Sequence, residues 1–178
     1  MTGLVMELLL EVLIGLAAAM ILRRYVLCFS LIRGRSMLPT LRDREVILVW
    51  RGAYLRSKPR RGDVVICYYP GRKMKAIPWM RQPMVKRVIG LPGEHLEIIE
   101  GQTFIDGHEL REDYLDERYT RFHRMQKEVQ LGENQYFVMG DNRDNSNDSR
   151  RVGPLEKNAI TGRAICVLWP PRAWRKIR

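Results

Sequence analysis

Residues 84–94 read MVKRVIGLPGE, and this short stretch is the most informative part of the sequence for both fold and function. Pro83 precedes it, and the turn residues Leu91-Pro92-Gly93 interrupt its apolar run. An apolar, β-branched segment bounded by such residues predicts a strand. Two adjacent cations, Lys86 and Arg87, lie inside this strand. Because the two cations are adjacent, their side chains must point to opposite faces of the strand.

Side-chain alternation gives the two cations different surroundings. Lys86 shares one strand face with Met84 and Val88, whereas Arg87 points to the opposite face, where we expect a carboxylate partner. Burial among apolar side chains disfavours the protonated amine and lowers the pKa of a lysine. A shift of about three units from the ordinary pKa of about 10.4 costs about 4 kcal/mol and leaves the amine neutral near pH 7. Lys86 is therefore a candidate general base.

A candidate partner for this base is Ser36, in the run Gly34-Arg35-Ser36-Met37-Leu38-Pro39-Thr40. A serine hydroxyl is a poor nucleophile until a base removes its proton, and a neutral lysine can do so. The three histidines all lie between Glu94 and Phe137, in a stretch with no comparable serine context. A Ser/His/Asp triad is the weaker interpretation, although chain order alone leaves it open. Taken singly, Ser36 and Lys86 also have ordinary explanations, as a turn serine and a solvent-facing lysine.

A third motif, residues 139–150, reads MGDNRDNSNDSR and directly follows an apolar run. Its three aspartates, three asparagines, two serines and two arginines predict a loop held by side-chain hydrogen bonds. A calcium loop is the competing interpretation. Counting from Asp141, however, the cation Arg143 stands at the third position, and Val152 stands at the twelfth, where a glutamate is needed. The spacing favours a structural loop.

Composition limits the broad class of protein. The 178 residues predict one domain behind an anchor. A net charge of +11 and a pI of about 10.0 suggest nucleic acid as a partner, but the basic residues are scattered and fit a solvated or phospholipid-facing surface equally well. We therefore expect no nucleic-acid partner. Three cysteines without metal-ligand spacing predict free thiols, with no disulfide framework, metal or other cofactor.

The N-terminal segment predicts a membrane anchor. Leu4–Leu22 is almost entirely apolar, is interrupted by Glu7 and Glu11, and approaches the about 20 residues that cross a bilayer. We expect residues 1–25 to form a single transmembrane helix, with a buried amphipathic helix as the alternative. A cleavable signal peptide is disfavoured because the first part of the segment carries two glutamates rather than positive charge, and two arginines follow the segment. Charge alone leaves the orientation open, because a large domain can be translocated regardless of its charge.

Residues 26–178 predict a mainly β domain. Apolar runs bounded by turn residues predict strands at 46–50, 64–69, 84–89, 136–139 and 164–169, and a hairpin at 95–105. Residues 111–127 are charged and weakly patterned, and we expect an exposed loop there, within a small insertion around 94–135. The expected architecture is an antiparallel β-sheet catalytic domain preceded by one membrane helix.

Together these segments strongly resemble the bacterial type I signal peptidases, membrane-anchored Ser/Lys endopeptidases that remove signal peptides from exported proteins. The resemblance extends from the anchor to Pro170, and its most specific parts are Gly140–Ser146 and the segment around Lys86. Gly34 and the short span between Gly93 and Tyr136 resemble Gram-positive-type members.

The resemblance implies a role for each matching residue. Ser36 would be the nucleophile and Lys86 the general base, and Ser146 would hydrogen-bond to the lysine amine and orient it. The Ser36 backbone N–H would stabilise the oxyanion with a second, unidentified donor in the Gly34 region, where some members carry a serine. The structural braces would be Arg87, Asp141, Arg143, Asp148 and Arg150, with Arg87 paired to Asp141.

The resemblance also implies substrates and partners. Signal peptides end in small residues of Ala-x-Ala type, so the site needs two shallow apolar pockets. Ile32, Met37 and Val85 flank the catalytic residues and are candidates to line these pockets, with ordinary core packing as the alternative. An extended substrate would pair with an exposed strand edge. The implied partners are signal-peptide-bearing preproteins, the phospholipid bilayer and the protein export machinery, with the catalytic domain on the extracytoplasmic face of the cell membrane.

Two other interpretations stay open. Another Ser/Lys processing peptidase, such as an organellar inner-membrane, conjugation or pilin maturation enzyme, would use the same pair of residues. A non-catalytic, basic, membrane-tethered module would bind nucleic acid or lipid with a salt-sensitive affinity that does not depend on Ser36.

Overall fold

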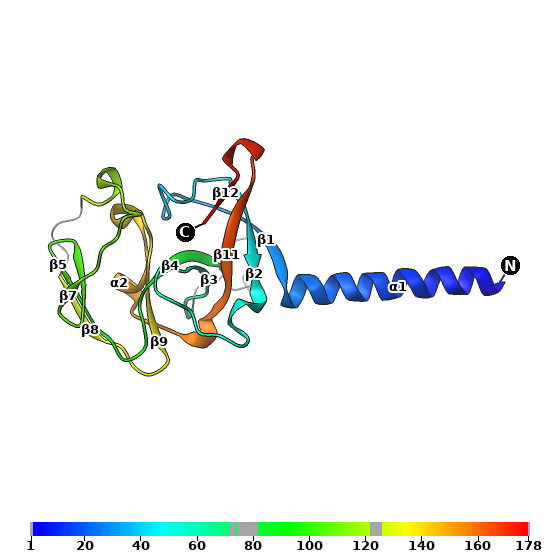
Figure 1. The fold of residues 1–178 in the computed structure, drawn as a ribbon, viewed down its shortest axis with the longest axis horizontal. Helices are drawn as coiled ribbons and strands as arrows, with labels where there is room; N and C mark the ends of the chain where they lie inside the picture. Colours follow the sequence, from blue (N-terminus) through cyan, green and yellow to red (C-terminus); the bar gives the residue numbers. More distant parts are fainter. Residues whose placement is uncertain (1, 72–73, 75–81, 122–125, 178) are drawn as a thin grey trace.

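The computed structural model describes residues 2–71, 74, 82–121 and 126–177, and within the N-terminal helix it describes the side chains of residues 5–20. A long helix projects from a β-rich body (Figure 1). This helix, α1, spans Thr2–Tyr25, and Val26 alone separates it from the first strand. The larger sheet comprises β1 (Leu27–Leu31), β2 (Val46–Trp50), β3 (Val64–Cys67), β4 (Met84–Gly90), β9 (Gln135–Met139), β10 (Leu155–Glu156), β11 (Ile160–Trp169) and β12 (Arg175–Lys176).

The larger sheet is antiparallel throughout. Its strand order is β1-β2-β11-β3-β4-β9-β10, with β12 paired to β11. Strand β4 therefore lies between β3 and β9, where Val65 faces Lys86 and Met139 faces Arg87. Strand β1 stands at one end of the order, with β2 as its sheet neighbour. The predicted mainly antiparallel β fold is confirmed, although β1 was not among the predicted strands.

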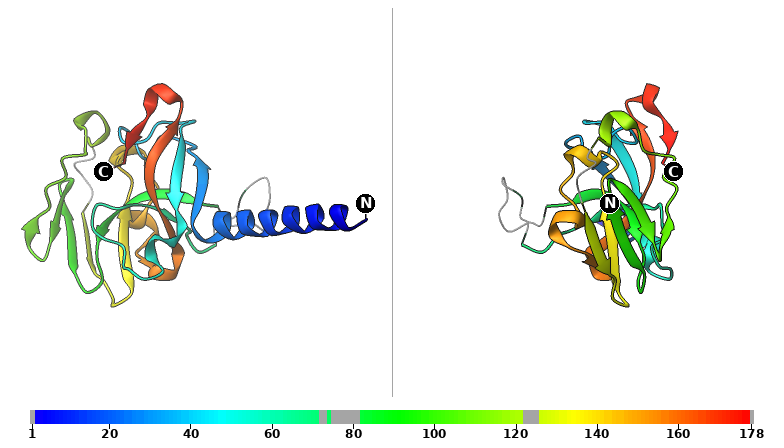
Figure 2. Two further views of the ribbon diagram at one scale, coloured as in Figure 1. Left: turned by 45° about the vertical axis from the view of Figure 1, so that its right-hand side comes forward. Right: turned by 90° about the vertical axis from the view of Figure 1, so that its left-hand side faces the viewer.

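A smaller antiparallel sheet is built from the region predicted as an insertion. Its strands are β5 (His95–Ile99), β6 (Gln102–Ile105), β7 (His108–Glu109) and β8 (Lys127–Gln130), in the order β7-β6-β5-β8. The predicted hairpin is formed by β5 and β6. Two views show this sheet at the end of the body opposite α1 (Figures 1 and 2). The short helices are α2 (Ser149–Val152) and the 3₁₀ helices η1 (Arg51–Tyr54), η2 (Glu117–Tyr119), η3 (Arg143–Asn145), η4 (Lys157–Ala159) and η5 (Pro171–Ala173).

Apolar side chains of β4 contribute to three separate clusters. Met84 and Val88 pack with a cluster formed mainly by β3 and β9, as the alternation of the strand requires. Val85 packs against a second cluster beneath β2 and β11, and Ile89 joins a third beneath the smaller sheet. Strand β4 thus connects the apolar interior of the whole body, and its charged residues lie among these clusters.

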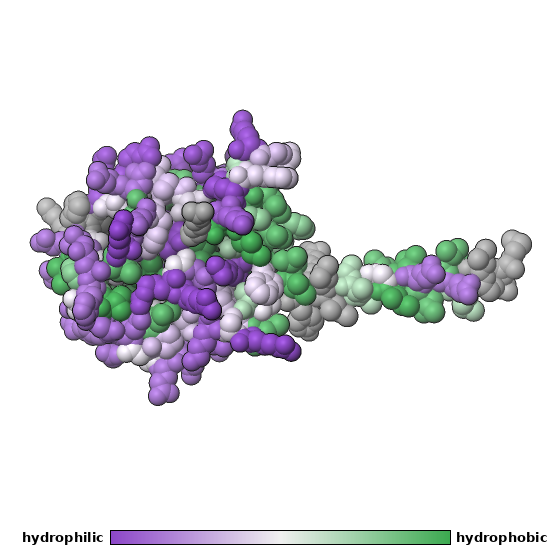
Figure 3. All heavy atoms as spheres, viewed as in Figure 1, coloured by the Kyte–Doolittle hydropathy of each residue, from purple (hydrophilic) through white to green (hydrophobic). Residues whose placement is uncertain are grey.

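Helix α1 forms where the anchor was expected, and its described apolar side chains are largely exposed. Met6 is 70% exposed and Met20 65%. Hydrophobic residues cover most of the visible helix surface in Figure 3, with a hydrophilic strip near the N-terminal end. Among the described residues, no helix combines the length and the apolar character needed to cross a membrane.

The expectation of an exposed loop at 111–127 is wrong for part of that segment. The side chain of Glu112 is only 7% exposed. The ring of Tyr114 lies against the buried guanidinium of Arg87. The segment therefore packs inward before it reaches η2 at Glu117, because two of its side chains meet buried arginines.

Candidate active site

Strand β4 buries Lys86 in an apolar environment. The side chain of Lys86 is 1% exposed and lies beside Val65 and the thiol-bearing Cys67 of β3. Burial lowers the pKa of the Lys86 amine, which has no ion-pair partner among the described residues. Burial likewise raises the pKa of the Cys67 thiol to about 12, so this neighbour stays uncharged. Lys86 is therefore biased toward the neutral form that a general base requires.

The hydroxyl of Ser36 meets this amine. Ser36 lies in the loop between β1 and β2, and Lys86 Nζ stands 2.8 Å from Ser36 Oγ. The base of the loop is closed by backbone hydrogen bonds between Ile32 and residues 44–45. Two residues 50 positions apart in sequence thus come into hydrogen-bond contact, in the geometry that proton transfer from serine to lysine needs.

The third motif holds the Ser36 loop from one side. Asn142 N donates to Ser36 O at 3.1 Å, and Asn142 Nδ2 donates to Arg35 O at 3.0 Å. A Cβ on Gly140 would lie 2.3 Å from Ser36 O, so only glycine allows this close approach. The sequence analysis did not single out Asn142. Asn142 lies in the polar run at residues 139–150, but nothing in that run distinguishes it from its polar neighbours.

Arg87 occupies the opposite face of β4 and is fully paired. Its Nε donates to Asp141 Oδ1 at 2.9 Å and its Nη2 to Asp141 Oδ2 at 2.7 Å. Arg87 Nη1 donates to Gly62 O at 2.9 Å, and the Tyr114 ring lies 3.9 Å from the guanidinium carbon. Asp141 also accepts from Thr40 Oγ1 at 2.5 Å. The Arg87–Asp141 pair therefore supports both β4 and the segment that follows Ser36.

Asp148 and Arg150 form a second buried pair behind the site. Arg150 Nε donates to Asp148 Oδ1 at 2.8 Å and Nη2 to Oδ2 at 2.9 Å, while Gly140 N donates to Asp148 Oδ2 at 2.9 Å. Burial alone would raise the pKa of Asp148, but these hydrogen bonds outweigh it and hold the pKa below its ordinary value. Arg150 Nη1 also donates to Arg143 O at 2.8 Å, so the pair braces the loop itself.

Arg143 connects this loop to the smaller sheet through Glu112. Arg143 Nη1 and Nη2 donate to the two oxygens of Glu112 at 3.0 and 2.5 Å. Thr103 Oγ1 and Tyr114 Oη donate to the same carboxylate. Glu112 does not stand out in the sequence, because the segment around it is rich in charge and gives no periodic signal.

Ser146 is buried close to Gly140, but the expected hydrogen bond to Lys86 is not formed. Ser146 Oγ has no hydrogen-bond partner among the described residues. A Cβ on Gly140 would lie 2.3 Å from this oxygen, so Ser146 packs against the backbone of the site. The side chain of Ser146 lies against Gly140 here, and its role in holding the Lys86 amine stays a prediction.

Gly34 has a specific backbone role beside the nucleophile. Its φ of +98° lies in the region that favours glycine, and its N–H donates to Asp43 Oδ1 at 2.7 Å. The Gly34 amide is therefore engaged and cannot also be an oxyanion donor in this arrangement. The Ser36 N–H, by contrast, donates to no backbone carbonyl within the described part of the chain.

A groove of about 590 Å³ opens beside Ser36 and Lys86. Its walls come from β1 and the loop after it on one side and from the start of β4 on the other. The structure brings the three predicted pocket residues together there, namely Ile32, Met37 and Val85. Ile32 and Met37 are also part of an apolar core cluster, so packing and pocket lining coincide at these positions.

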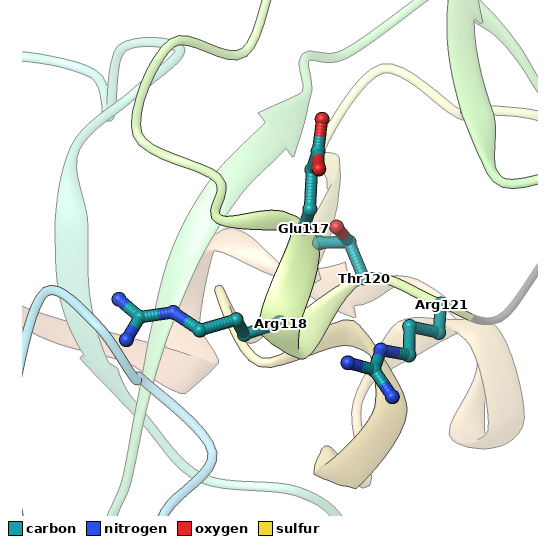
Figure 4. Close-up of a pocket in the computed structure, with 4 residues that line it drawn as sticks. All are labelled: Glu117, Arg118, Thr120 and Arg121. Carbon is teal, nitrogen blue, oxygen red and sulfur yellow. The ribbon is translucent and has the colours of Figure 1, made fainter.

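Two other features lie outside this groove. A depression of about 400 Å³ is lined by Glu117, Arg118, Thr120 and Arg121 and contains no pair of nucleophile and base (Figure 4). On the smaller sheet, His95, Glu97 and Glu128 bring ligand-type atoms within 4.8 Å of one another, at partly exposed positions. Neither feature includes a residue of the Ser36 loop or of β4.

The antiparallel β body places a serine hydroxyl and a buried lysine amine together beside a groove, an arrangement of the kind that serine peptidases use. The chain belongs to the signal peptidase family: residues 5–169 match the family model described as signal peptidase, peptidase S26. It is 34% identical over 160 residues to a signal peptidase I of Leptolyngbya laminosa, covering 88% of this chain and 77% of that protein. It is 33% identical over 174 residues to signal peptidase I S of Bacillus subtilis, covering 93% and 89%.

A solved structure gives the same result for the fold. A crystal structure of a signal peptidase I from Enterococcus faecalis matches with a TM-score of 0.50 and 30% sequence identity. The match covers 60% of this chain and 97% of that chain. Family membership establishes a peptidase hydrolase that acts on signal peptides, and it confirms the predicted resemblance.

Proposed function

We propose that this chain is a membrane-bound endopeptidase that uses Ser36 and Lys86 to cleave N-terminal signal peptides from preproteins after small residues. The observation that carries the proposal is the 2.8 Å contact between Lys86 Nζ and Ser36 Oγ, made by an amine that is 1% exposed. Family membership supplies the reaction, and this contact supplies the residues that would perform it.

The proposed reaction follows from the protonation state of Lys86. Because burial lowers its pKa, the amine can accept the Ser36 proton as Oγ attacks the scissile carbonyl. The same ammonium then returns a proton to the departing amine of the mature protein. A water molecule activated by the neutral amine would hydrolyse the acyl-enzyme, which regenerates Ser36.

The oxyanion of this reaction would be held by the Ser36 N–H and a second donor. Gly34 shapes the turn in this proposal and leaves its own amide with Asp43. Ser146 would support the lysine in this proposal, because its buried hydroxyl has no hydrogen-bond partner among the described residues and lies, like the backbone of Ser36, against Gly140. An oxyanion donor contributes about 10²–10³ in rate, so the second donor is a substantial part of the reaction.

The substrate would lie extended in the groove. Ile32, Met37 and Val85 give apolar walls that suit the small side chains of an Ala-x-Ala segment. Within the described residues β1 pairs with β2 alone, so its other edge would be available to an extended peptide. The depth and polarity of the groove would then determine which substrate side chains are accepted before the cleaved bond.

The membrane part of the proposal rests on α1 and on the family. We propose that residues 1–25 anchor the chain and that residues 26–178 act on the extracytoplasmic face, close to the bilayer and the export machinery. Alkaline carbonate extraction of membranes that contain the full chain measures this directly. Retention in the membrane fraction is expected, and complete release would contradict an integral anchor.

The cleavage test uses the full chain in detergent with a preprotein that carries an Ala-x-Ala site. Wild type is expected to cut after that site, as read from the mass of the mature product. Ser36→Ala and Lys86→Met should abolish the cut while circular dichroism stays unchanged. Lys58→Met is the matched control, since Lys58 is exposed and remote in sequence from the site, and it should cut normally. Persistent cutting by Ser36→Ala and Lys86→Met would overturn the assignment of the pair, and cutting elsewhere would favour another processing peptidase.

A further inference from the structure

The C-terminal strand lies against the loop that carries Ser36. Strand β12 pairs with β11, and its Arg175 contacts Thr40 and Glu45 of the segment between β1 and β2. The match to the family model ends at residue 169, so β12 lies beyond it. The contacts of this strand therefore belong to a part of the chain to which no role has yet been assigned.

Arg175 of β12 binds the buried carboxylate of Glu45, at the end of the loop that carries Ser36. Its Nη1 donates to Glu45 Oε1 at 2.9 Å and its Nη2 to Glu45 Oε2 at 2.7 Å. Glu45 is 3% exposed, and its carboxylate also accepts from Arg42 N at 2.9 Å. The backbone of Glu45 accepts from Ile32 N at 2.8 Å. Glu45 thus joins both ends of the loop, and Arg175 holds Glu45.

The same guanidinium reaches the middle of the loop. Arg175 Nη2 donates to Thr40 O at 2.6 Å. Thr40 is held from the other side by the hydrogen bond of its hydroxyl to Asp141. Leu38 N donates to Arg35 O at 3.3 Å and Leu41 N to Met37 O at 2.8 Å, so two overlapping turns connect Ser36 to Thr40. A displacement of Thr40 is therefore passed to Ser36.

We propose that Arg175 is a positioning residue for Ser36, holding the nucleophile turn against Lys86 through the Thr40 carbonyl and Glu45. The proposal rests on the proposed function for the roles of Ser36 and Lys86. Asp141 and Asn142 hold the turn on the side of β9, and Arg175 holds it on the side of β12. Proton transfer depends on a 2.8 Å contact, and a misplacement of about 1 Å can cost about 10²-fold in rate.

The contact geometry explains why an arginine is needed. The planar guanidinium serves both carboxylate oxygens and a carbonyl from one fixed fork. A lysine at 175 would keep the charge for Glu45 but has a single nitrogen, which cannot serve both groups in this geometry. Arg175→Lys therefore keeps the ion pair with Glu45, which stabilises the fold, and loses the hydrogen bond to Thr40 O, which positions the Ser36 turn.

The test compares Arg175→Gln and Arg175→Lys with Arg172→Gln in the full chain. Arg172 is the matched control because it lies in the same C-terminal segment, is exposed and makes no ion pair among the described residues. Arg175→Gln is expected to lower both the melting temperature and kcat, with kcat falling about tenfold or more and KM changing less than twofold. Arg175→Lys should restore most of the melting temperature and leave kcat low. Arg172→Gln should match wild type in all three quantities.

Hydrogen–deuterium exchange provides a readout that does not need cleavage. Both Arg175 variants should exchange the amides of residues 35–41 faster than wild type, and Arg172→Gln should not. Unchanged exchange in this segment would overturn the proposal even if the Ser36 assignment were wrong. Full recovery of kcat in Arg175→Lys would also overturn it, because the charge on Glu45 alone would then suffice.

Discussion

The two faces of strand β4 bury two neighbouring cations in opposite ways. Lys86 and Arg87 are each 1% exposed. Arg87 meets both oxygens of Asp141 and the ring of Tyr114, whereas Lys86 meets one serine hydroxyl and apolar side chains. Burial of a charge is costly unless a partner compensates it. The Arg87 charge is therefore compensated and supports the structure, whereas burial lowers the pKa of the Lys86 amine, as the proposed base requires.

The strongest way to break this contrast is to place an arginine on the lysine face. Arginine stays protonated in proteins, so Lys86→Arg would bury an uncompensated charge. We expect cleavage to fall by at least about 10²–10⁴-fold and thermal stability to drop. Lys86→Met is the comparison, with the same loss of cleavage and no loss of stability. Stability equal to wild type in Lys86→Arg would show that the lysine face tolerates charge.

Removing the carboxylate from the arginine face should act mainly on stability. Asp141→Asn leaves the Arg87 charge buried with one compensating partner fewer. The expected loss is about 3–5 kcal/mol in the free energy of unfolding, measured by denaturant titration. The cleavage rate per folded molecule should stay close to that of wild type. An unchanged melting temperature together with lost cleavage would contradict this division of roles.

The two faces should also differ in their response to pH. Because burial lowers the pKa of Lys86, the unfolded chain binds more protons than the folded chain between that lowered pKa and the ordinary lysine value. The free energy of unfolding therefore gains a positive contribution as pH rises through this window, by at most about 1.4 kcal/mol per pH unit. Denaturant titrations of wild type and Lys86→Met across the alkaline range measure the difference. Identical slopes would mean that Lys86 is not desolvated.

The smallest effect is expected at the ring over Arg87. Tyr114→Leu removes both the ring contact at 3.9 Å and the hydroxyl that donates to Glu112, and should lower the free energy of unfolding by about 1–2 kcal/mol. Tyr119→Leu is the control, because its ring lies 5.7 Å from the exposed Arg118 and should contribute little. If the two substitutions lowered the free energy of unfolding equally in chemical denaturation, the Tyr114 ring would not stabilise the buried Arg87.

The sequence predicted the features that depend on local pattern. Alternation along residues 84–89 placed Lys86 with Met84 and Val88, and the structure puts these three on one face. Turn residues marked the ends of β4 and of the β5–β6 hairpin. Period-two alternation and turn chemistry act over a few residues, so they can be found in one sequence without knowledge of the partners.

The features that depend on distant contacts could not be predicted. Glu112 and Arg175 reach the site only after the smaller sheet and β12 have folded against the body. Nothing in the residues around them distinguishes them from other charged side chains of a chain with 31 lysines and arginines. The partner of the Ser146 hydroxyl likewise depends on one side-chain rotamer, which a sequence pattern does not determine.

The junction between α1 and β1 has a mechanical consequence. Val26 alone joins the two elements, and its carbonyl accepts a hydrogen bond from Arg51 N at 2.8 Å, so the junction is tied to η1. A helix of 24 residues is about 36 Å long at about 1.5 Å per residue. Because β1 also lines the groove, the short junction sets the direction in which α1 leaves the groove wall.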